Sequence, residues 1–254
     1  MNNIMFYKES NFRETSIGRI PKDWEVGKLG NVVEIHDNKR IPLSEMERST
    51  RKGSYPYCGA NGVIDYIDDY IFDGEFVLLA EDGGAYGKFE NSAYIMQGKF
   101  WVNNHAHVIR AIPNKTTNVF ILFVLNFLDL NPYIVGTTRK KLNQEQMKGI
   151  KIPLPPLSEQ QKIAEVLCTI DEAIQKTNEI IAKTEHLKKG LMQELLTKGI
   201  GHKEFKDTEI GRIPKEWEVV KLNEVAEIRS NRVVSRFYKL LSFQWNLFLT
   251  QVYL

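Results

Sequence analysis

Apolar residues recur with a seven-residue spacing between residues 158 and 198. Ile163, Ile170 and Leu191 lie on one such row, and further apolar residues stand three and four positions after its members. This spacing places the apolar side chains along one face of an α-helix. The segment contains no proline, so we predict a single uninterrupted helix.

Local signals mark both ends of this predicted helix. Ser158 and Gln161 have the spacing of a capping box after a proline-rich stop, and Gly199 follows the last helical residue. A helix of about 40 residues is ~60 Å long, and its polar face mixes acidic and basic residues, which does not favour DNA. We therefore predict that its apolar face pairs with another helix. The predicted dimer or partner contacts are Ile163, Leu167, Ile170, Ile174, Ile181, Leu187, Leu191 and Leu195.

Residues 17–157 have a different pattern, in which short apolar runs alternate with turn signals. Such runs predict short strands. Residues 119–130 are apolar enough for a buried helix, and residues 144–148 fit a short one, so the fold class is α+β. The predicted turns lie at 59–62, 73–74, 82–84 and 103–104.

The chain contains an internal repeat. Residues 17–35 return at 210–228 with 14 of 19 positions identical. We therefore predict a mixed α/β domain over 1–157, a long coiled-coil-forming helix over 158–198, and a linker with the truncated start of a second domain over 199–254.

Charge is informative only locally, because the formal net charge of this 254-residue chain is +2. Residues 39–52 hold five basic and two acidic residues, and residues 136–152 hold five basic and one acidic. Such patches suit DNA phosphates, although a solubilising surface would look the same. Residues 65–90 hold eight acidic residues and should face away from DNA or lie in hairpin turns. The candidate DNA-binding residues are Lys39, Arg40, Arg51, Lys52, Thr137, Thr138, Arg139, Lys140 and Lys141.

Signatures of catalysis and of metal binding are missing from the sequence. No phosphate-binding loop or methyltransferase motif is found, and Cys58 and Cys168 lack partner motifs for zinc or a disulfide. His105 and His107 alternate along a predicted strand without a third ligand, which favours hydrogen bonding over a metal site. We predict a non-catalytic cytoplasmic protein with no membrane segment, no catalytic residue and no bound metal.

Four strings, in the same order, resemble the specificity subunit of Type I restriction-modification systems. They are GRIPKDWE, YCGANGVIDYIDDYIFDGEFVLLAEDGG, KFWVNNHAHVIR and KKLNQEQMKGIKIPLPPLSEQQKIAEVL. The resemblance covers residues 17 to about 228 and implies target-recognition domains, each reading one half of a bipartite double-stranded DNA site in a phage-defence system. It further implies long helices that pair antiparallel and hold adenine-methylating subunits.

The resemblance also implies the partners and cofactors. They are the Type I methylation subunit, which binds S-adenosylmethionine, and the restriction subunit, which uses ATP and magnesium; this chain itself binds no cofactor. Only one recognition domain and one long helix are present, so we expect a half subunit that pairs with itself or with another half subunit. Two alternatives remain open at this point: a truncated, silent or inhibitory fragment that binds partner subunits, and a catalytic nuclease or methyltransferase.

Overall fold

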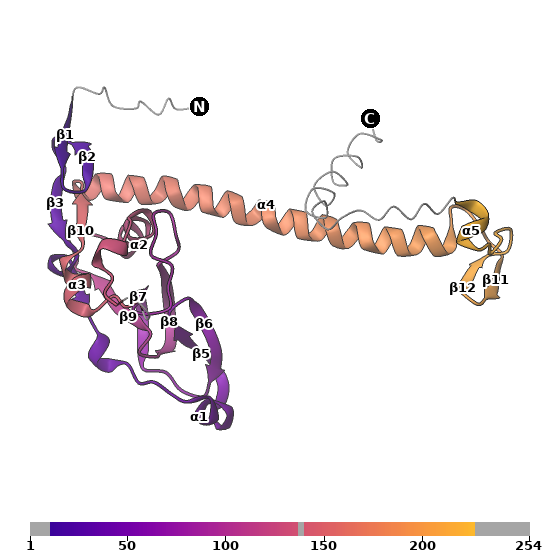
Figure 1. The fold of residues 1–254 in the computed structure, drawn as a ribbon, viewed down its shortest axis with the longest axis horizontal. Helices are drawn as coiled ribbons and strands as arrows, with labels where there is room; N and C mark the ends of the chain where they lie inside the picture. The colour runs from indigo at the N-terminus through magenta and orange to yellow at the C-terminus, as the bar shows by residue number, and fades with distance from the viewer. Residues whose placement is uncertain (1–10, 137–139, 227–254) are drawn as a thin grey trace. The chain divides into compact units, whose positions relative to one another are not determined.

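The computed structural model describes residues 11–136 and 140–226 (Figure 1). The chain divides into two compact units, residues 1–176 and 177–254, and the division falls inside the long helix. The first unit packs helices against a β-sheet, so the predicted α+β class is confirmed. The predicted boundaries at 157 and 198 divide the chain differently and stay a prediction.

A six-stranded sheet forms the centre of the first unit. Its neighbours are antiparallel except for β5 and β8, which run parallel. In spatial order the strands are β4 (Val33–Ile35), β9 (Ala106–Ala111), β7 (Phe72–Ala80), β8 (Ala93–Val102), β5 (Lys52–Gly59) and β6 (Gly62–Ile67). The short helices of this unit are α1 (Glu45–Thr50), α2 (Asn118–Phe127) and α3 (Gln144–Gly149).

Successive residues of β7 point to opposite faces of the sheet, as the two-residue period of a strand requires. Val77 and Leu79 join the larger core cluster, which contains the buried residues of α2 and α3. Phe76 and Leu78 join a second cluster, where the ring of Phe76 packs edge-on against Phe100. Both faces of β7 are thus buried, so the strand lies at the centre of the unit.

Two smaller ladders flank this sheet. Strands β1 (Phe12–Thr15) and β2 (Gly18–Pro21) form a hairpin, and β3 (Glu25–Lys28) pairs antiparallel with β10 (Lys151–Leu154). The second ladder joins the beginning of the domain to its end, directly before the long helix α4 (Leu157–Lys198).

Helix α4 begins at Leu157, one residue before the predicted start. The backbone amides of Glu159 and Gln160 donate to the carbonyl oxygen of Pro156, so Ser158 lies inside the first turn. The prediction of Ser158 as the capping residue was therefore wrong. None of the described helices is long and apolar enough to cross a membrane.

The second unit repeats the hairpin of the first. Strands β11 (Phe205–Thr208) and β12 (Gly211–Pro214) pair in the register of β1 and β2. The Thr208 hydroxyl donates to the carbonyl of Gly211 at 2.6 Å, as the Thr15 hydroxyl does to Gly18. Both turns need glycine, because φ is +103° at Gly18 and +111° at Gly211. Helix α5 (Leu222–Val225) then follows.

The turn signals were correct at 59–62, 82–84 and 103–104, which connect or follow strands. The predicted turn at 73–74 was wrong, because β7 continues through these residues. Gly74 has φ +128° and faces Gly98, which has φ +83°, across the ladder with β8. The ladder nevertheless stays in register from residue 72 to residue 79, so an Asp-Gly pair that usually marks a turn lies inside a strand.

Candidate nucleic-acid interface

The acidic segment 65–90 meets only one of our two expectations: several of its acids, such as Asp68 and Glu81, lie in connections between strands, but the segment contacts basic residues instead of facing away from them. The β5–β6 register sets Lys52 opposite Ile67, so residues 65–69 lie beside residues 51 and 52. Lys52 Nζ lies 2.7 Å from Asp65 Oδ1, and Arg51 Nη2 lies 2.9 Å from Asp68 Oδ1. Arg51 also stacks over the ring of Trp101. These two predicted DNA contacts are therefore committed to neighbouring side chains.

Two of the other basic candidates, Arg40 and Lys141, converge on the carboxylate of Glu81, directly after β7. Arg40 Nη1 lies 2.6 Å from Glu81 Oε2, and Lys141 Nζ lies 2.8 Å from Glu81 Oε1. Two basic segments separated by about 100 residues in the sequence thus meet at this point. Their neighbours Lys39 and Lys140 are exposed and form no ion pair with the residues that the structure describes.

A buried histidine lies beside this cluster. His107 is 1% exposed, with Nδ1 2.6 Å from Asp37 Oδ2 and Nε2 2.7 Å from the carbonyl oxygen of Leu142. A carbonyl oxygen accepts only, so Nε2 donates to Leu142, while Nδ1 lies within hydrogen-bonding distance of the Asp37 carboxylate. Asp37 also accepts from the Val108 amide at 2.9 Å and from Gln144 Nε2 at 3.1 Å.

The environment keeps both carboxylates ionised. Burial raises the pKa of Asp37, but the hydrogen bond and positive charge of His107, with the donors from Val108 and Gln144, hold that pKa below its ordinary value. Burial likewise raises the pKa of Glu81, and the hydrogen bonds from Lys141 and Arg40 outweigh it and lower that pKa. The cluster is therefore a network of charges that neutralise one another.

The donor atoms of Asp37, Glu81 and His107 lie within 4.8 Å of one another, a spacing that also suits a metal ion. A metal would need a free nitrogen lone pair on His107, yet Nε2 donates to the Leu142 carbonyl and Nδ1 already contacts the Asp37 carboxylate at 2.6 Å. It would also displace the two cations that already contact Glu81. The residues present fit an ion-pair network and not a metal site.

The structure separates the two histidines that the sequence places together. His107 belongs to β9, whereas His105 precedes that strand, is 41% exposed at its side chain and contacts Asp82 through Nδ1 at 2.5 Å. Sequence reasoning missed Asp37, Glu81 and Gln144 altogether. The available signal was the pair of acidic residues directly after the most apolar strand, since an acid at the end of a buried strand requires a cation nearby.

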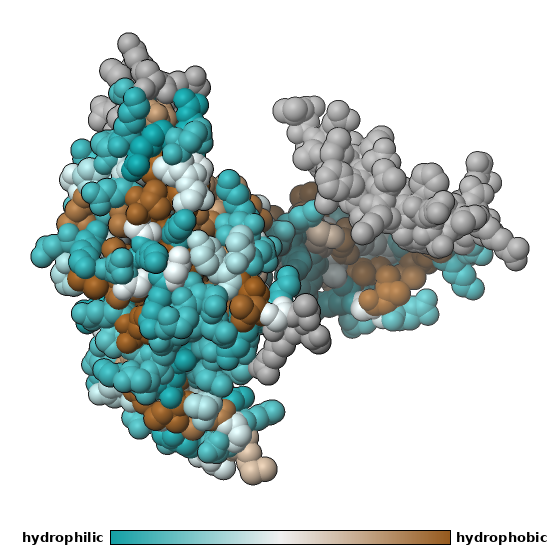
Figure 2. All heavy atoms as spheres, turned by 60° about the vertical axis from the view of Figure 1, so that its left-hand side comes forward, coloured by the Kyte–Doolittle hydropathy of each residue, from teal (hydrophilic) through white to brown (hydrophobic). Residues whose placement is uncertain are grey.

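Three of the nine candidates, Thr137, Thr138 and Arg139, lie outside the described residues. Lys39 and Lys140 are therefore the two described candidates that remain available to a ligand. The face of the first unit turned forward in Figure 2 is mostly hydrophilic, with separate apolar patches. This polar character is compatible with a charged partner.

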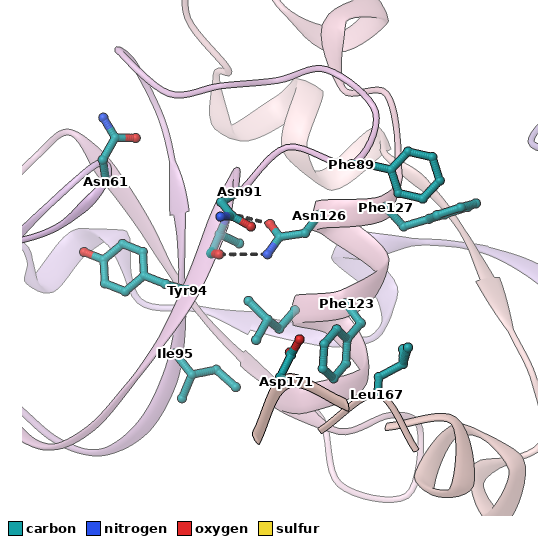
Figure 3. Close-up of a pocket in the computed structure, with 12 residues that line it drawn as sticks. Asn61, Phe89, Asn91, Tyr94, Ile95, Phe123, Asn126, Phe127, Leu167 and Asp171 are labelled. Atoms are coloured by element: carbon teal, nitrogen blue, oxygen red, sulfur yellow. Dashed lines mark hydrogen bonds between the residues drawn. The ribbon is translucent and has the colours of Figure 1, made fainter. Parts of the chain in front are cut away.

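The predicted partner residues of α4 fall into two groups. Ile163 packs against the core of the first unit, and Leu167 lines a cavity of about 710 Å³ between α2, β8 and α4. In this cavity Phe123 and Leu167 lie near Asp171, while Asn126 forms two hydrogen bonds with the backbone of Ala93 (Figure 3). The remaining six have 43–60% of their surface exposed: Ile170, Ile174, Ile181, Leu187, Leu191 and Leu195.

Known proteins are similar to this chain in sequence and in fold. A family model described as the Type I restriction modification DNA specificity domain matches residues 21–186. The Type I restriction enzyme MjaVIII specificity subunit of Methanocaldococcus jannaschii is 35% identical over 242 residues, covering 90% of this chain and 55% of that protein. The chain spans about half the length of the curated relatives it matches.

Two solved structures have a similar fold. The Type I restriction-modification system S subunit from M. genitalium aligns over 68% of this chain and 45% of its own, with a TM-score of 0.54 and 16% identity. A chain from a structure titled as the basis of complex assembly and conformational transition of the type I R-M system aligns over 74% and 48%, with a TM-score of 0.53 and 20% identity.

Proposed function

This chain belongs to the Type I restriction-modification DNA specificity family, and we propose that its first unit reads one half of a bipartite double-stranded DNA target. The relatives are specificity subunits, which are the non-catalytic components of Type I complexes. The proposal gives this chain the same role, so that cleavage and methylation belong to other subunits.

The observation that carries the proposal is the convergence of two basic segments at Glu81. Their exposed members Lys39 and Lys140 are next in sequence to Arg40 and Lys141 and form no ion pair with a described residue, so their ammonium groups can contact phosphate oxygens. Base contacts would come from residues close to these two, because phosphate contacts fix the register in which a protein meets the base edges.

The partners and cofactors form a second part of the proposal. The chain assembles with a methylation subunit that binds S-adenosylmethionine, and with a restriction subunit that uses ATP and magnesium. Helix α4 supplies a contact surface, since six apolar side chains on it are exposed. Full burial of such a side chain contributes roughly 1.5–3 kcal/mol, and about half of that gain is still available here, so a second helix is the expected occupant, from another copy or from a different half subunit.

The exposed apolar row of α4 also favours a second candidate function. Because the row does not involve the cluster at Glu81, a chain that bound no DNA could still occupy partner subunits and act as a silent or inhibitory module. The two functions differ in one measurable property, which is the affinity of the chain for DNA.

A salt titration of DNA binding tests the proposal. The chain is titrated into a fluorescent mixed-sequence duplex at several salt concentrations, and the Lys39→Ala, Lys140→Ala double variant is compared with the wild type. The slope of log K against log salt is negative, and loss of two phosphate contacts should make it shallower by about 1.8. The control is Lys183→Ala with Lys189→Ala, which removes two exposed charges from α4. Equal slopes for the wild type and the Lys39/Lys140 variant would exclude this surface.

A further inference from the structure

Glu81 is an acidic residue at the centre of a surface that we propose binds the DNA anion, where a negative charge is unfavourable. Its side chain is 10% exposed, and each carboxylate oxygen contacts a cation from a different segment. A carboxylate beside DNA repels phosphate, so its presence costs affinity unless it does something else.

The Glu81 backbone is fixed on both sides. Its amide donates to the carbonyl of His105 at 2.8 Å, and its carbonyl accepts from the Leu142 amide at 2.7 Å. Arg40 is held just as firmly, since it also donates to the carbonyls of Asp37 and Ala106. The carboxylate therefore joins two segments at fixed points, and neither side can move without breaking hydrogen bonds.

The two cations that Glu81 holds are not well placed for DNA. The Arg40 side chain is 14% exposed and the Lys141 side chain is 42% exposed, and both point at the carboxylate. Residues 135 and 141 pair in a bridge, so the backbone at Lys141 is extended and consecutive side chains alternate in direction. Lys140 is accordingly exposed while Lys141 contacts Glu81.

We propose that Glu81 is a positioning residue for the DNA surface: by holding Arg40 and Lys141 together, it sets the separation of Lys39 and Lys140. This inference rests on the proposed function and assigns different roles to two groups of basic residues. Arg40 and Lys141 support the surface from inside, and the lysines next to them in sequence contact the phosphates.

The proposal and simple electrostatics predict opposite changes in DNA affinity when Glu81 is replaced. Removing one negative charge near DNA should strengthen binding if charge alone matters. Removing the residue that positions two phosphate contacts should weaken it. Glu81→Gln keeps the shape and removes the charge, and Glu145→Gln on α3 is a matched control, because Glu145 is exposed and pairs only with its helix neighbour Lys148 among the described residues.

We expect Glu81→Gln to weaken duplex binding about tenfold. The slope of log K against log salt should become shallower by about 0.9–1.8, which corresponds to the loss of one or two phosphate contacts. Glu145→Gln should leave the slope unchanged. The decisive measurement is Glu81→Gln in the Lys39→Ala, Lys140→Ala background, where it should have no further effect on affinity, since residues acting through one another are non-additive. A residue that merely maintains the fold would weaken binding further in that background.

Glu81→Asp provides a second variant should the glutamine variant fold poorly. It keeps the charge but is one methylene shorter, so it reaches only one of the two cations and should weaken binding by a smaller factor. The inference is overturned if Glu81→Gln binds as tightly as the wild type while the double lysine variant is weakened. If the double lysine variant also binds like the wild type, the proposed DNA surface itself is wrong.

Discussion

Trp24 donates its indole Nε1–H to a carboxylate oxygen of Glu159 at 3.1 Å. The two residues are 135 positions apart and join the internal repeat to the first turn of α4. A carboxylate in the first turn of a helix also interacts favourably with the positive end of the helix dipole. One hydrogen bond thus fixes the repeat to the helix, in addition to the β3–β10 ladder.

Replacing Trp24 by Phe should lower the free energy of unfolding by about 1–2 kcal/mol, because the smaller phenyl ring stays aromatic but has no N–H to donate to Glu159. Urea unfolding followed by circular dichroism measures this change. The matched control is Trp217→Phe at the equivalent position of the second copy, where the ring packs edge-on against His202. Equal losses in the two variants would show that the Trp24 hydrogen bond contributes nothing.

Acid should destabilise the first unit through Asp37 and Glu81. Their folded-state pKa values lie below the ordinary ones, so they contribute stability that is present above about pH 4 and is lost as the pH falls through the folded-state values. Asp37→Asn should cost about 1–3 kcal/mol at pH 7 and flatten the acid limb of a plot of unfolding free energy against pH. The exposed Glu14→Gln is the control, and an acid limb as steep in Asp37→Asn as in the control would contradict the assignment.

If two copies of the chain pair through α4, substitutions in the apolar row of this helix should halve the mass of the particle in solution. Ile174→Glu with Ile181→Glu should convert a dimer to a monomer in sedimentation, because two charges would enter an apolar contact. The control is Gln175→Glu with Ala182→Glu, which adds the same two charges at the same spacing one residue further along the helix. Self-pairing also predicts that the selected or methylated DNA site is an interrupted palindrome. A monomeric wild type, or a site with two unlike halves, would favour pairing with a different half subunit.

Phe89 should be strained, since φ is +63° at this bulky residue. The residue is 73% exposed, and its ring packs edge-on against Phe127, with Lys88 over both rings. Phe89→Gly and Phe89→Ala both lose these contacts, but only glycine relieves the backbone. The glycine variant should therefore be about 1 kcal/mol more stable than the alanine variant in thermal unfolding. An alanine variant of equal or greater stability would show that the backbone relaxes in the absence of the ring.

The helices were the most predictable part of the fold, because their signal is local. The spacing of Ile170, Ile174 and Ile181 gave α4, and the apolar run at 119–130 gave α2, which ends at Phe127. The sheet order could not be predicted. It depends on contacts between strands far apart in sequence, such as the parallel pairing of Tyr57 with Trp101, and no local pattern specifies them.

The candidate site was predictable in composition but not in pairing. The basic segments were visible from their charge, whereas the acids that hold them are set by the β5–β6 register and by the end of β7. Asp65 and Glu81 appeared together as one acidic segment expected to avoid DNA. In the structure they bind different basic residues, since a strand register brings charges together that sequence order separates.

The pairing of β3 with β10 has a consequence for how new specificities arise. The ladder joins residues 25–28 to residues 151–154. The segment between them, residues 29–150, therefore begins and ends at two neighbouring strands. Recombination between genes could replace residues 29–150 by a different sequence. The β1–β2 hairpin and helix α4 would be retained. The near-identical copies at 17–35 and 210–228 offer homologous sequence at which such a crossover starts. Under the proposed function, such an exchange would change the DNA target while the proposed helix contacts of α4 stay the same.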